Sequence, residues 1–212
     1  ALRGTPLNAE QSKTLDNALR DFVLSGAQLA ETQRSQFAAQ QAELAQLQQT
    51  FSEHVLDATY AFEYHTTDAA QLTGLPADEL AARAAAAQAQ GKTGYWVTLH
   101  MPSYLPVMQY CDNRALRETL YRAYATRASE LGAAEHDNSG LMQRIVALRA
   151  EQAALLGYDS YAQLSLVTKM ASSPAQVDEF LLDLAQQARP GALNDLSELQ
   201  AHAAAHLGLP QL

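Results

Sequence analysis

The sequence has a single cysteine, Cys111, so no disulfide bond can form within the chain. One cysteine fits a reducing compartment, and we expect a cytoplasmic protein. No run of apolar residues is long enough to span a membrane. Residues 1–22 lack the order of basic, apolar and small residues that marks a signal peptide, and they do not begin with methionine. We therefore expect an internal or processed start.

Basic residues are scarce relative to acidic ones. Lys and Arg total 14 against 23 Asp and Glu, which gives a formal charge of -9. An acidic chain without a basic tract argues against nucleic acid as a partner and against an anionic membrane surface. Acidity at this level mainly favours solubility, and attraction of basic peptides is the weaker alternative.

Glycine and proline are also few, 10 and 7 in 212 residues, whereas alanine, leucine, glutamine and glutamate dominate. This composition favours helices. Capping residues and apolar periodicity predict them over residues 8–24, 31–59, 77–90, 114–131, 140–156, 160–170 and 174–207. In the last of these, Val177, Phe180, Leu181 and Leu184 share an apolar face, and Pro190 is expected to kink or split the helix near Arg189.

Two short runs, Tyr60–His65 and Gly94–Met101, have the character of strands and are expected to pair as an antiparallel ribbon. Between the second run and the next helix, Pro102–Pro106 predicts extended or turn backbone. Alternatively, Pro106 lies in the first turn of a short helix capped by Ser103. The predicted fold class is all-α, mainly a helical bundle, with a small antiparallel β ribbon.

The domain organisation is expected to be one mostly helical piece over residues 1–212. A subdivision is possible into a helical hairpin (1–59), a ribbon with a helix (60–110) and a helical bundle (111–212). The long helix over 31–59 has a Gln- and Glu-rich polar face and needs a partner along its length.

Among the six histidines, His202 and His206 have the spacing that places two imidazoles on one helical face, as in helical zinc sites. A peptidase also needs a Glu after the first histidine, and Ala203 stands there. We therefore expect a pair of surface histidines that nickel can occupy adventitiously, and no metal ligands. His65 and His100 lie near the ends of the two predicted strands, and either half-exposed packing or a meeting across the ribbon is possible. Cys111 is expected to be a small buried hydrophobe.

Arginines and tyrosines alternate in an ordered way between Arg114 and Arg127, with Arg114 and Glu118 spaced as an i,i+4 pair. Three interpretations remain open. The segment is a solvated face with salt bridges, or it anchors a bundle through buried hydrogen bonds to Asp137 or Glu151. In the third, Tyr121, Tyr124 and Arg127 line a peptide channel, where Arg127 takes a substrate carboxylate.

The order of several motifs along the chain resembles the zinc oligopeptidases of the thimet family, peptidase family M3, and particularly its bacterial members. The resemblance rests on Thr98–Val107 (TLHMPSYLPV), Tyr110–Asn113 (YCDN), Asp137-Asn138, Leu155–Gly157 (LLG) and Lys169–Ala171 (KMA). Each motif is short, but together they recur in order over nearly the whole chain.

The resemblance implies a mainly helical, clam-shell peptidase that cuts short peptides in a deep channel. It also implies zinc and a catalytic Glu on a helix later in the family's chain. No His-Glu-x-x-His occurs in this sequence, so none of the family's catalytic or zinc residues can be assigned to it. We therefore expect a non-catalytic channel-wall or scaffold fragment of a metalloprotease (a hydrolase of short peptides), inactive alone and partnered by the missing catalytic half. The alternative is an independent helical interaction module without enzymatic activity, motivated by the long Gln-rich helix.

Overall fold

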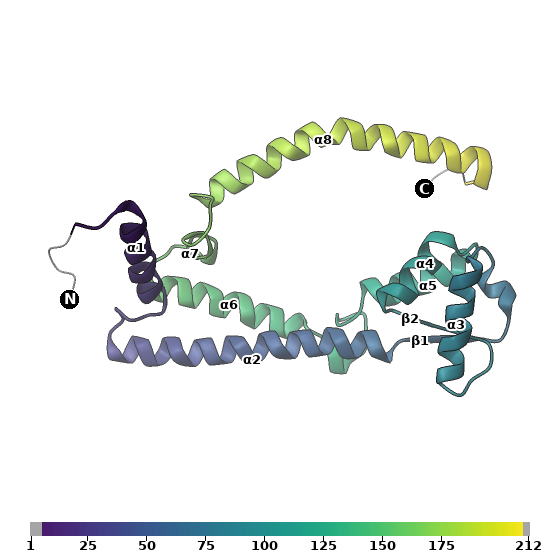
Figure 1. Ribbon diagram of the computed structural model, residues 1–212, viewed down its shortest axis with the longest axis horizontal. Coiled ribbons are helices and arrows are strands. Elements are labelled where there is room, and N and C mark those ends of the chain that lie inside the picture. The colour runs from purple at the N-terminus through teal and green to yellow at the C-terminus, as the bar shows by residue number, and fades with distance from the viewer. Residues whose placement is uncertain (1–5, 210–212) are drawn as a thin grey trace. The chain divides into compact units, whose positions relative to one another are not determined.

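The structure is a computed structural model that describes residues 6–209 (Figure 1). It is mainly helical, and its described residues contain one two-stranded antiparallel ribbon, so the predicted fold class is confirmed. The chain divides into two compact units, one formed by residues 30–149 and the other by residues 1–29 with 150–212. The subdivision at residues 59 and 110 stays a prediction.

The larger unit holds most of the elements. They are α2 (Glu31–Ala61), β1 (Glu63–Thr66), η1 (Ala69–Leu72), α3 (Ala77–Ala89), β2 (Tyr95–Thr98), α4 (Met101–Tyr110), α5 (Arg114–Ala125), η2 (Ala134–His136) and most of α6 (Ser139–Leu155). Strands β1 and β2 pair in register from Glu63 opposite Thr98 to Thr66 opposite Tyr95.

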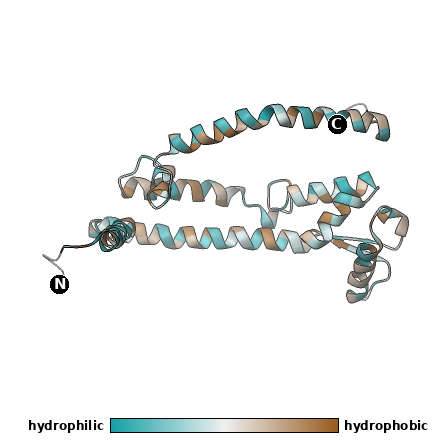
Figure 2. Ribbon diagram, turned by 45° about the horizontal axis from the view of Figure 1, so that its top comes forward, coloured by the Kyte–Doolittle hydropathy of each residue, from teal (hydrophilic) through white to brown (hydrophobic). Residues whose placement is uncertain are grey.

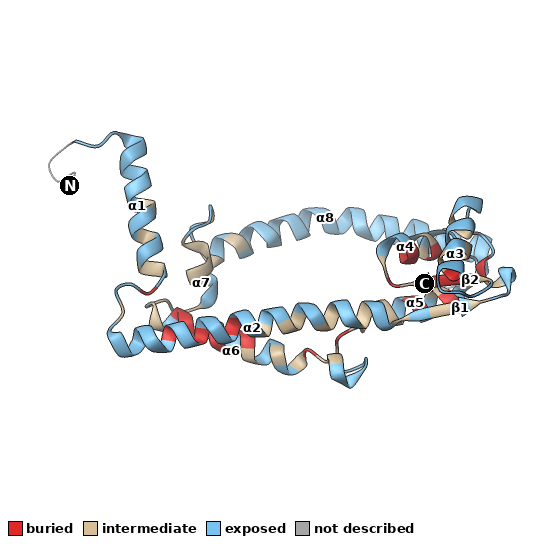
Figure 3. Ribbon diagram, turned by 60° about the horizontal axis from the view of Figure 1, so that its bottom comes forward, coloured by how far each residue is buried: buried red, intermediate tan, exposed pale blue. Residues whose placement is uncertain are grey.

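The main hydrophobic core lies where the ribbon meets α4 and α5. Its buried members are Leu72, Val97, Leu99, Tyr104, Val107, Cys111, Leu116 and Leu120. Figure 3 shows buried residues clustered around these elements. Full burial of one such aliphatic side chain contributes about 1.5–3 kcal/mol, so this cluster is the principal anchor of the unit. The expected burial of Cys111 is confirmed, with 2% of its surface exposed.

A second, smaller core joins α2 to α6. Leu44 of α2 packs with Ile145 and Leu148 of α6, and the two helices run side by side (Figure 1). Across the same contact the Arg144 guanidinium donates to both carboxylate oxygens of Glu43, at 2.6 and 2.8 Å. Helix α2 therefore has the partner that its length requires.

Helix α4 corrects the expectation for Pro102–Pro106. The helix begins at Met101 with His100 as its N-cap, and Pro106 lies inside it. A proline in this place leaves the carbonyl four residues earlier without its helical donor. That carbonyl, of Pro102, instead accepts a 2.7 Å hydrogen bond from the Arg83 guanidinium of α3. Ser103 is not the cap, because its hydroxyl accepts the backbone N–H of Thr98 in β2.

Other boundaries differ by a few residues from those predicted. Helix α2 continues to Ala61, so the first strand begins at Glu63 and not at Tyr60. Helix α5 ends at Ala125, six residues before the expected Leu131, because the backbone turns at Ala128 with a φ of +54°.

The smaller unit contains α1 (Ala9–Leu24), the end of α6, α7 (Tyr161–Leu166), α8 (Pro174–His202) and the π-helical turn η3 (Ala203–Leu207). Asn8 and Ser173 cap α1 and α8 by accepting the backbone N–H of Gln11 and Gln176. Helix α8 continues through Pro190, so the expected split does not occur, and Figure 1 shows the helix curving gently. No helix between residues 6 and 209 has the length and apolar character to cross a bilayer.

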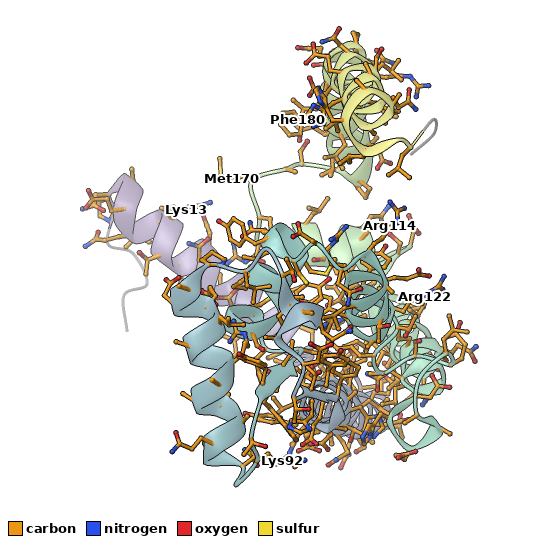
Figure 4. All side chains as sticks on the ribbon, turned by 90° about the vertical axis from the view of Figure 1, so that its right-hand side faces the viewer. Lys13, Lys92, Arg114, Arg122, Met170 and Phe180 are labelled. Atoms are coloured by element: carbon orange, nitrogen blue, oxygen red, sulfur yellow. The ribbon has the colours of Figure 1, made fainter. Side chains whose placement is uncertain are left out.

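Helices α1 and α8 contain no buried residue. The predicted apolar face of α8 is solvent-exposed, at 61% for Phe180, 54% for Leu181 and 47% for Leu184. Figure 2 shows apolar residues recurring along this helix, and Figure 4 shows Phe180 projecting from it.

Candidate functional site

Helix α5 and the turn after it position the candidate site. Asn113 caps α5 by accepting the N–H of Leu116, which fixes where the helix begins. Tyr121, Tyr124 and Arg127 follow one another at intervals of three residues, so they lie along one side of the segment. Thr126 is the C-cap, which places Arg127 just past the end of the helix.

The structure brings Tyr124 and Arg127 together and adds Tyr104 from α4. The rings of Tyr104 and Tyr124 are stacked, with centroids 4.4 Å apart and an interplanar angle of 19°. The Arg127 guanidinium lies 3.7 Å from the centroid of the Tyr124 ring, and its Nη1 donates to the Tyr124 carbonyl at 3.1 Å. Stacking on both an aromatic ring and a cation fixes the orientation of Tyr124.

Burial raises the pKa of Tyr104, and the neighbouring Tyr124 and Tyr121 raise it further, whereas Arg127 opposes the rise. The Tyr104 hydroxyl therefore stays protonated at neutral pH. Tyr121 itself is 59% exposed and presents its ring to solvent. The cluster thus combines a fixed aromatic pair, an exposed tyrosine and a guanidinium.

A pocket of about 300 Å³ adjoins Arg127. Its lining includes Phe62, Leu99, Leu131 and His136, together with Arg127 and the turn that follows α5. Within residues 6–209, Arg127 forms no ion pair with a carboxylate. The pocket is therefore mainly apolar with one uncompensated positive charge, an arrangement that suits a ligand with an apolar group and an anionic end.

The predicted carboxylate contacts of this segment are different in the structure. Glu118 pairs with Arg122 at 2.9 Å, not with Arg114, and Arg122 projects outward from α5 (Figure 4). Asp137 accepts the backbone N–H and the hydroxyl of Ser139 at 2.9 and 2.7 Å. These two hydrogen bonds hold the pKa of Asp137 below its usual value. Asp137 therefore caps the start of α6 and does not pair with Arg127.

Asn138 links the turn that carries Arg127 to α2 through hydrogen bonds, which the sequence did not predict. Its side chain is 2% exposed, donates to the Phe51 carbonyl at 3.1 Å and accepts from Nδ1 of His54 at 2.9 Å. Its backbone N–H also donates to the carbonyl of Ala128 at 3.2 Å. The Asp137-Asn138 motif was the available signal, but its partners lie more than eighty residues earlier in the chain.

The ribbon histidines do not meet. His65 lies beside Trp96 and hydrogen-bonds the Thr93 carbonyl at 2.7 Å. His100 instead packs edge-on against Tyr60, with ring centroids 4.5 Å apart. The two histidines therefore pack against different aromatic residues, as the packing alternative predicted.

The chain belongs to peptidase family M3, because residues 107–212 match the model of that family. Among curated relatives, it is 50% identical over 208 residues to Oligopeptidase A of Escherichia coli, covering 97% of this chain and 31% of that protein. It is 48% identical to Oligopeptidase A of Haemophilus influenzae, covering 95% of this chain and 30% of that protein. Identity to Dipeptidyl carboxypeptidase of Escherichia coli is 32%, covering 92% of this chain and 28% of that protein. The chain spans about a third of the length of these relatives.

The residues present do not fit the zinc that the family resemblance implies. Between residues 6 and 209, no group of three or more His, Cys, Asp or Glu side chains is arranged to hold a metal ion. A catalytic zinc site needs about three protein ligands and a nearby general base. We therefore assign no zinc ligand of the peptidase to this chain.

Proposed function

We propose that this chain forms a non-catalytic, channel-wall part of a zinc metalloendopeptidase that hydrolyses short peptides. The observation that carries the proposal is the 50% identity to Oligopeptidase A of Escherichia coli. The match covers nearly the whole of this chain but only 31% of Oligopeptidase A. Zinc and the general base then belong to the remaining polypeptide, and this chain alone is inactive. In this proposal the enzyme acts in the cytoplasm.

In this proposal, Tyr121, Tyr124 and Arg127 line the peptide channel. The uncompensated Arg127 guanidinium binds the terminal carboxylate of a peptide, and the apolar pocket beside it takes the adjoining side chain. Tyr121 offers an exposed ring and hydroxyl. The stacked Tyr104 and Tyr124 hold the cation in place, so that it does not need to be ordered when the peptide binds.

The exposed apolar face of α8 is proposed to dock against the catalytic half. Nearer the helix end, Leu193, Leu196 and Leu199 are also exposed, each between 45% and 59%. Large apolar side chains exposed together on one helix face mark a contact surface. The same face also suits the rival proposal, an independent helical interaction module.

Complementation distinguishes the two proposals. The chain is mixed with a separately expressed C-terminal portion of Oligopeptidase A, and cleavage of a quenched short peptide is followed with and without a chelator. We expect no cleavage by the chain alone and chelator-sensitive cleavage by the mixture. Zinc-dependent cleavage by the chain alone contradicts its non-catalytic role. A folded chain that neither binds nor activates the C-terminal portion favours the interaction module.

In the active mixture, Arg127→Met tests the channel assignment. A charge-assisted hydrogen bond contributes about 1.5–3 kcal/mol, so kcat/KM for a peptide with a free C-terminus should fall by about ten- to a hundredfold. The amidated peptide should be nearly unaffected. Arg122→Met is the matched control, because Arg122 lies on the exposed side of α5 with Glu118. Equal losses for both peptides contradict the carboxylate role of Arg127.

A further inference from the structure

Two histidines lie side by side at the end of α8. His202 is the last residue of α8 and His206 lies in η3, with ring centroids 4.5 Å apart and an interplanar angle of 39°. Both are exposed, and neither ring has a hydrogen bond or ion pair with another described residue. The two imidazoles are therefore adjacent and have free nitrogens.

The backbone between them is a π-helical turn. It spans Ala203–Leu207 and ends at Gly208, whose φ of +64° closes the helix. The backbone N–H groups of Gly208 and Leu209 both donate to the Ala203 carbonyl, and Ala203 is 2% exposed. Single π-helical turns are rare and occur frequently at functional sites. The turn is thus an ordered element that holds the two histidines on one face.

The end of a helix also favours a cation. Carbonyl groups of the last turn carry the negative end of the helix dipole, which attracts positive charge within about one turn. One turn before His202, the Glu198 carboxylate accepts a 2.8 Å hydrogen bond from Asn194 and adds negative charge to the same region. The location is therefore electrostatically suited to a divalent ion.

In contrast to the expectation from the sequence, we propose that His202 and His206 are metal ligands that bind one Ni²⁺, Cu²⁺ or Zn²⁺ ion, each through one imidazole nitrogen. Imidazole suits these ions, whereas Mg²⁺, Ca²⁺ and Mn²⁺ prefer oxygen ligands. Nitrogen–metal distances of about 2.0–2.1 Å bring two ligand rings close together, and the rings are already neighbours. Water completes the coordination. The site is not that of the peptidase, because Ala203 stands where the general base belongs.

Binding is coupled to the helical ending. The two rings share a face only while residues 202–206 are helical, so the ion binds the folded turn and not the unfolded segment. Saturating Ni²⁺ should therefore slow amide exchange in η3 and in the last turn of α8. Exchange in α1, which lacks histidine, should not change.

Isothermal titration of the 212-residue chain with NiCl2 tests the proposal. The chain must carry no polyhistidine tag, because a tag binds the same ions. We expect one ion per chain, and His202→Ala and His206→Ala should each weaken binding by about tenfold or more. Cu²⁺ bound to the parent chain should show nitrogen coupling from two imidazoles in its electron paramagnetic resonance spectrum. Absence of binding, or binding unchanged in both variants, overturns the proposal.

The double variant His206→Ala/Ala204→His is the matched control. It keeps the number of histidines but places them two residues apart, where they do not face each other on a helix. Ala204 is exposed, so the new side chain fits without repacking. The double variant should lose affinity as the single variants do, and retention of parent affinity also overturns the proposal. His65→Ala removes an exposed histidine elsewhere and should leave Ni²⁺ binding unchanged.

Discussion

At the scale of single residues, the turn at Ala128 decides where Arg127 lies. Ala128 is the one non-glycine residue with a positive φ among residues 6–209. The left-handed conformation costs a non-glycine residue about 1–2 kcal/mol. The hydrogen bond from Asn138 to the Ala128 carbonyl offsets this cost, since Asn138 is in turn held by α2. The strained backbone is therefore maintained by a contact between distant segments.

Ala128→Val should destabilise the larger unit by about 2 kcal/mol or more. A β-branched side chain is strongly disfavoured at positive φ, and the φ of Ala128 is +54°. Urea denaturation followed by circular dichroism measures the change. Ala133→Val is the matched control, because Ala133 is exposed and has an extended backbone at φ -71° and ψ 128°, which valine adopts readily. Equal stability of the two variants contradicts the strained turn.

At the scale of secondary-structure elements, α2 and α6 are joined by a small apolar core and by the Glu43–Arg144 pair. The hydrogen bond from Arg144 lowers the pKa of Glu43 below its usual value, and the Coulomb attraction of Arg144 adds to the effect. Both side chains are partly exposed, at 43% and 42%, so the pair is screened by water and salt. The pair therefore contributes little to stability.

Glu43→Gln should reduce stability at pH 7 by a small amount that vanishes in acid. Because the folded-state pKa is lowered, the contribution of Glu43 is present above pH 4.5 and is lost as the pH falls through the folded-state value. The measurement is the difference in free energy of unfolding between parent and variant from pH 7 to pH 3. Asp57→Asn, on α2 and without an ion pair among the described residues, should show no such convergence. A difference that persists at pH 3 contradicts the ionic contribution.

At the scale of the whole molecule, the two units differ in how much they bury. The larger unit holds both hydrophobic cores, whereas α1 and α8 of the smaller unit bury no residue. Helices α2 and α8 are similar in length, with 31 and 29 residues, but only α2 has buried side chains. Helix α2 buries Phe37, Gln40 and Leu44.

Hydrogen exchange should reveal this difference in the isolated chain. Helices without buried contacts open locally with little free-energy cost, so amides of α8 should exchange much faster than those of α2 and α5. Mass spectrometry of peptic fragments measures the rates, with α2 as the length-matched reference. Addition of the catalytic portion should slow exchange in α8 if the proposed docking is correct. Equal protection of α8 and α2 in the isolated chain contradicts the expected difference.

Much of the helical framework could be predicted because its signals are local. The side chains of Asn8 and Ser173 cap their helices by accepting a backbone N–H only three residues later in the chain. Gly91 and Gly157 take positive φ just after the helices that they end. The placement of Tyr121 and Tyr124 one turn apart on α5 also follows from helical spacing alone. Tyr104 could not be found this way, because its stacking on Tyr124 depends on how α4 packs against α5.

The sequence by itself determined the helical class, the ribbon, most helix starts and the family, since each depends on residue type and near spacing. Only the tertiary structure decided that Pro106 lies inside a helix. The Pro102 carbonyl, which Pro106 leaves without a helical donor, accepts a hydrogen bond from Arg83 of another helix. The tertiary structure also decided that Arg127 lies directly before the strained residue Ala128, whose backbone is held by Asn138 and, through it, by α2. Contacts between residues far apart in the chain overrode local preference at both places, and no local pattern encodes them.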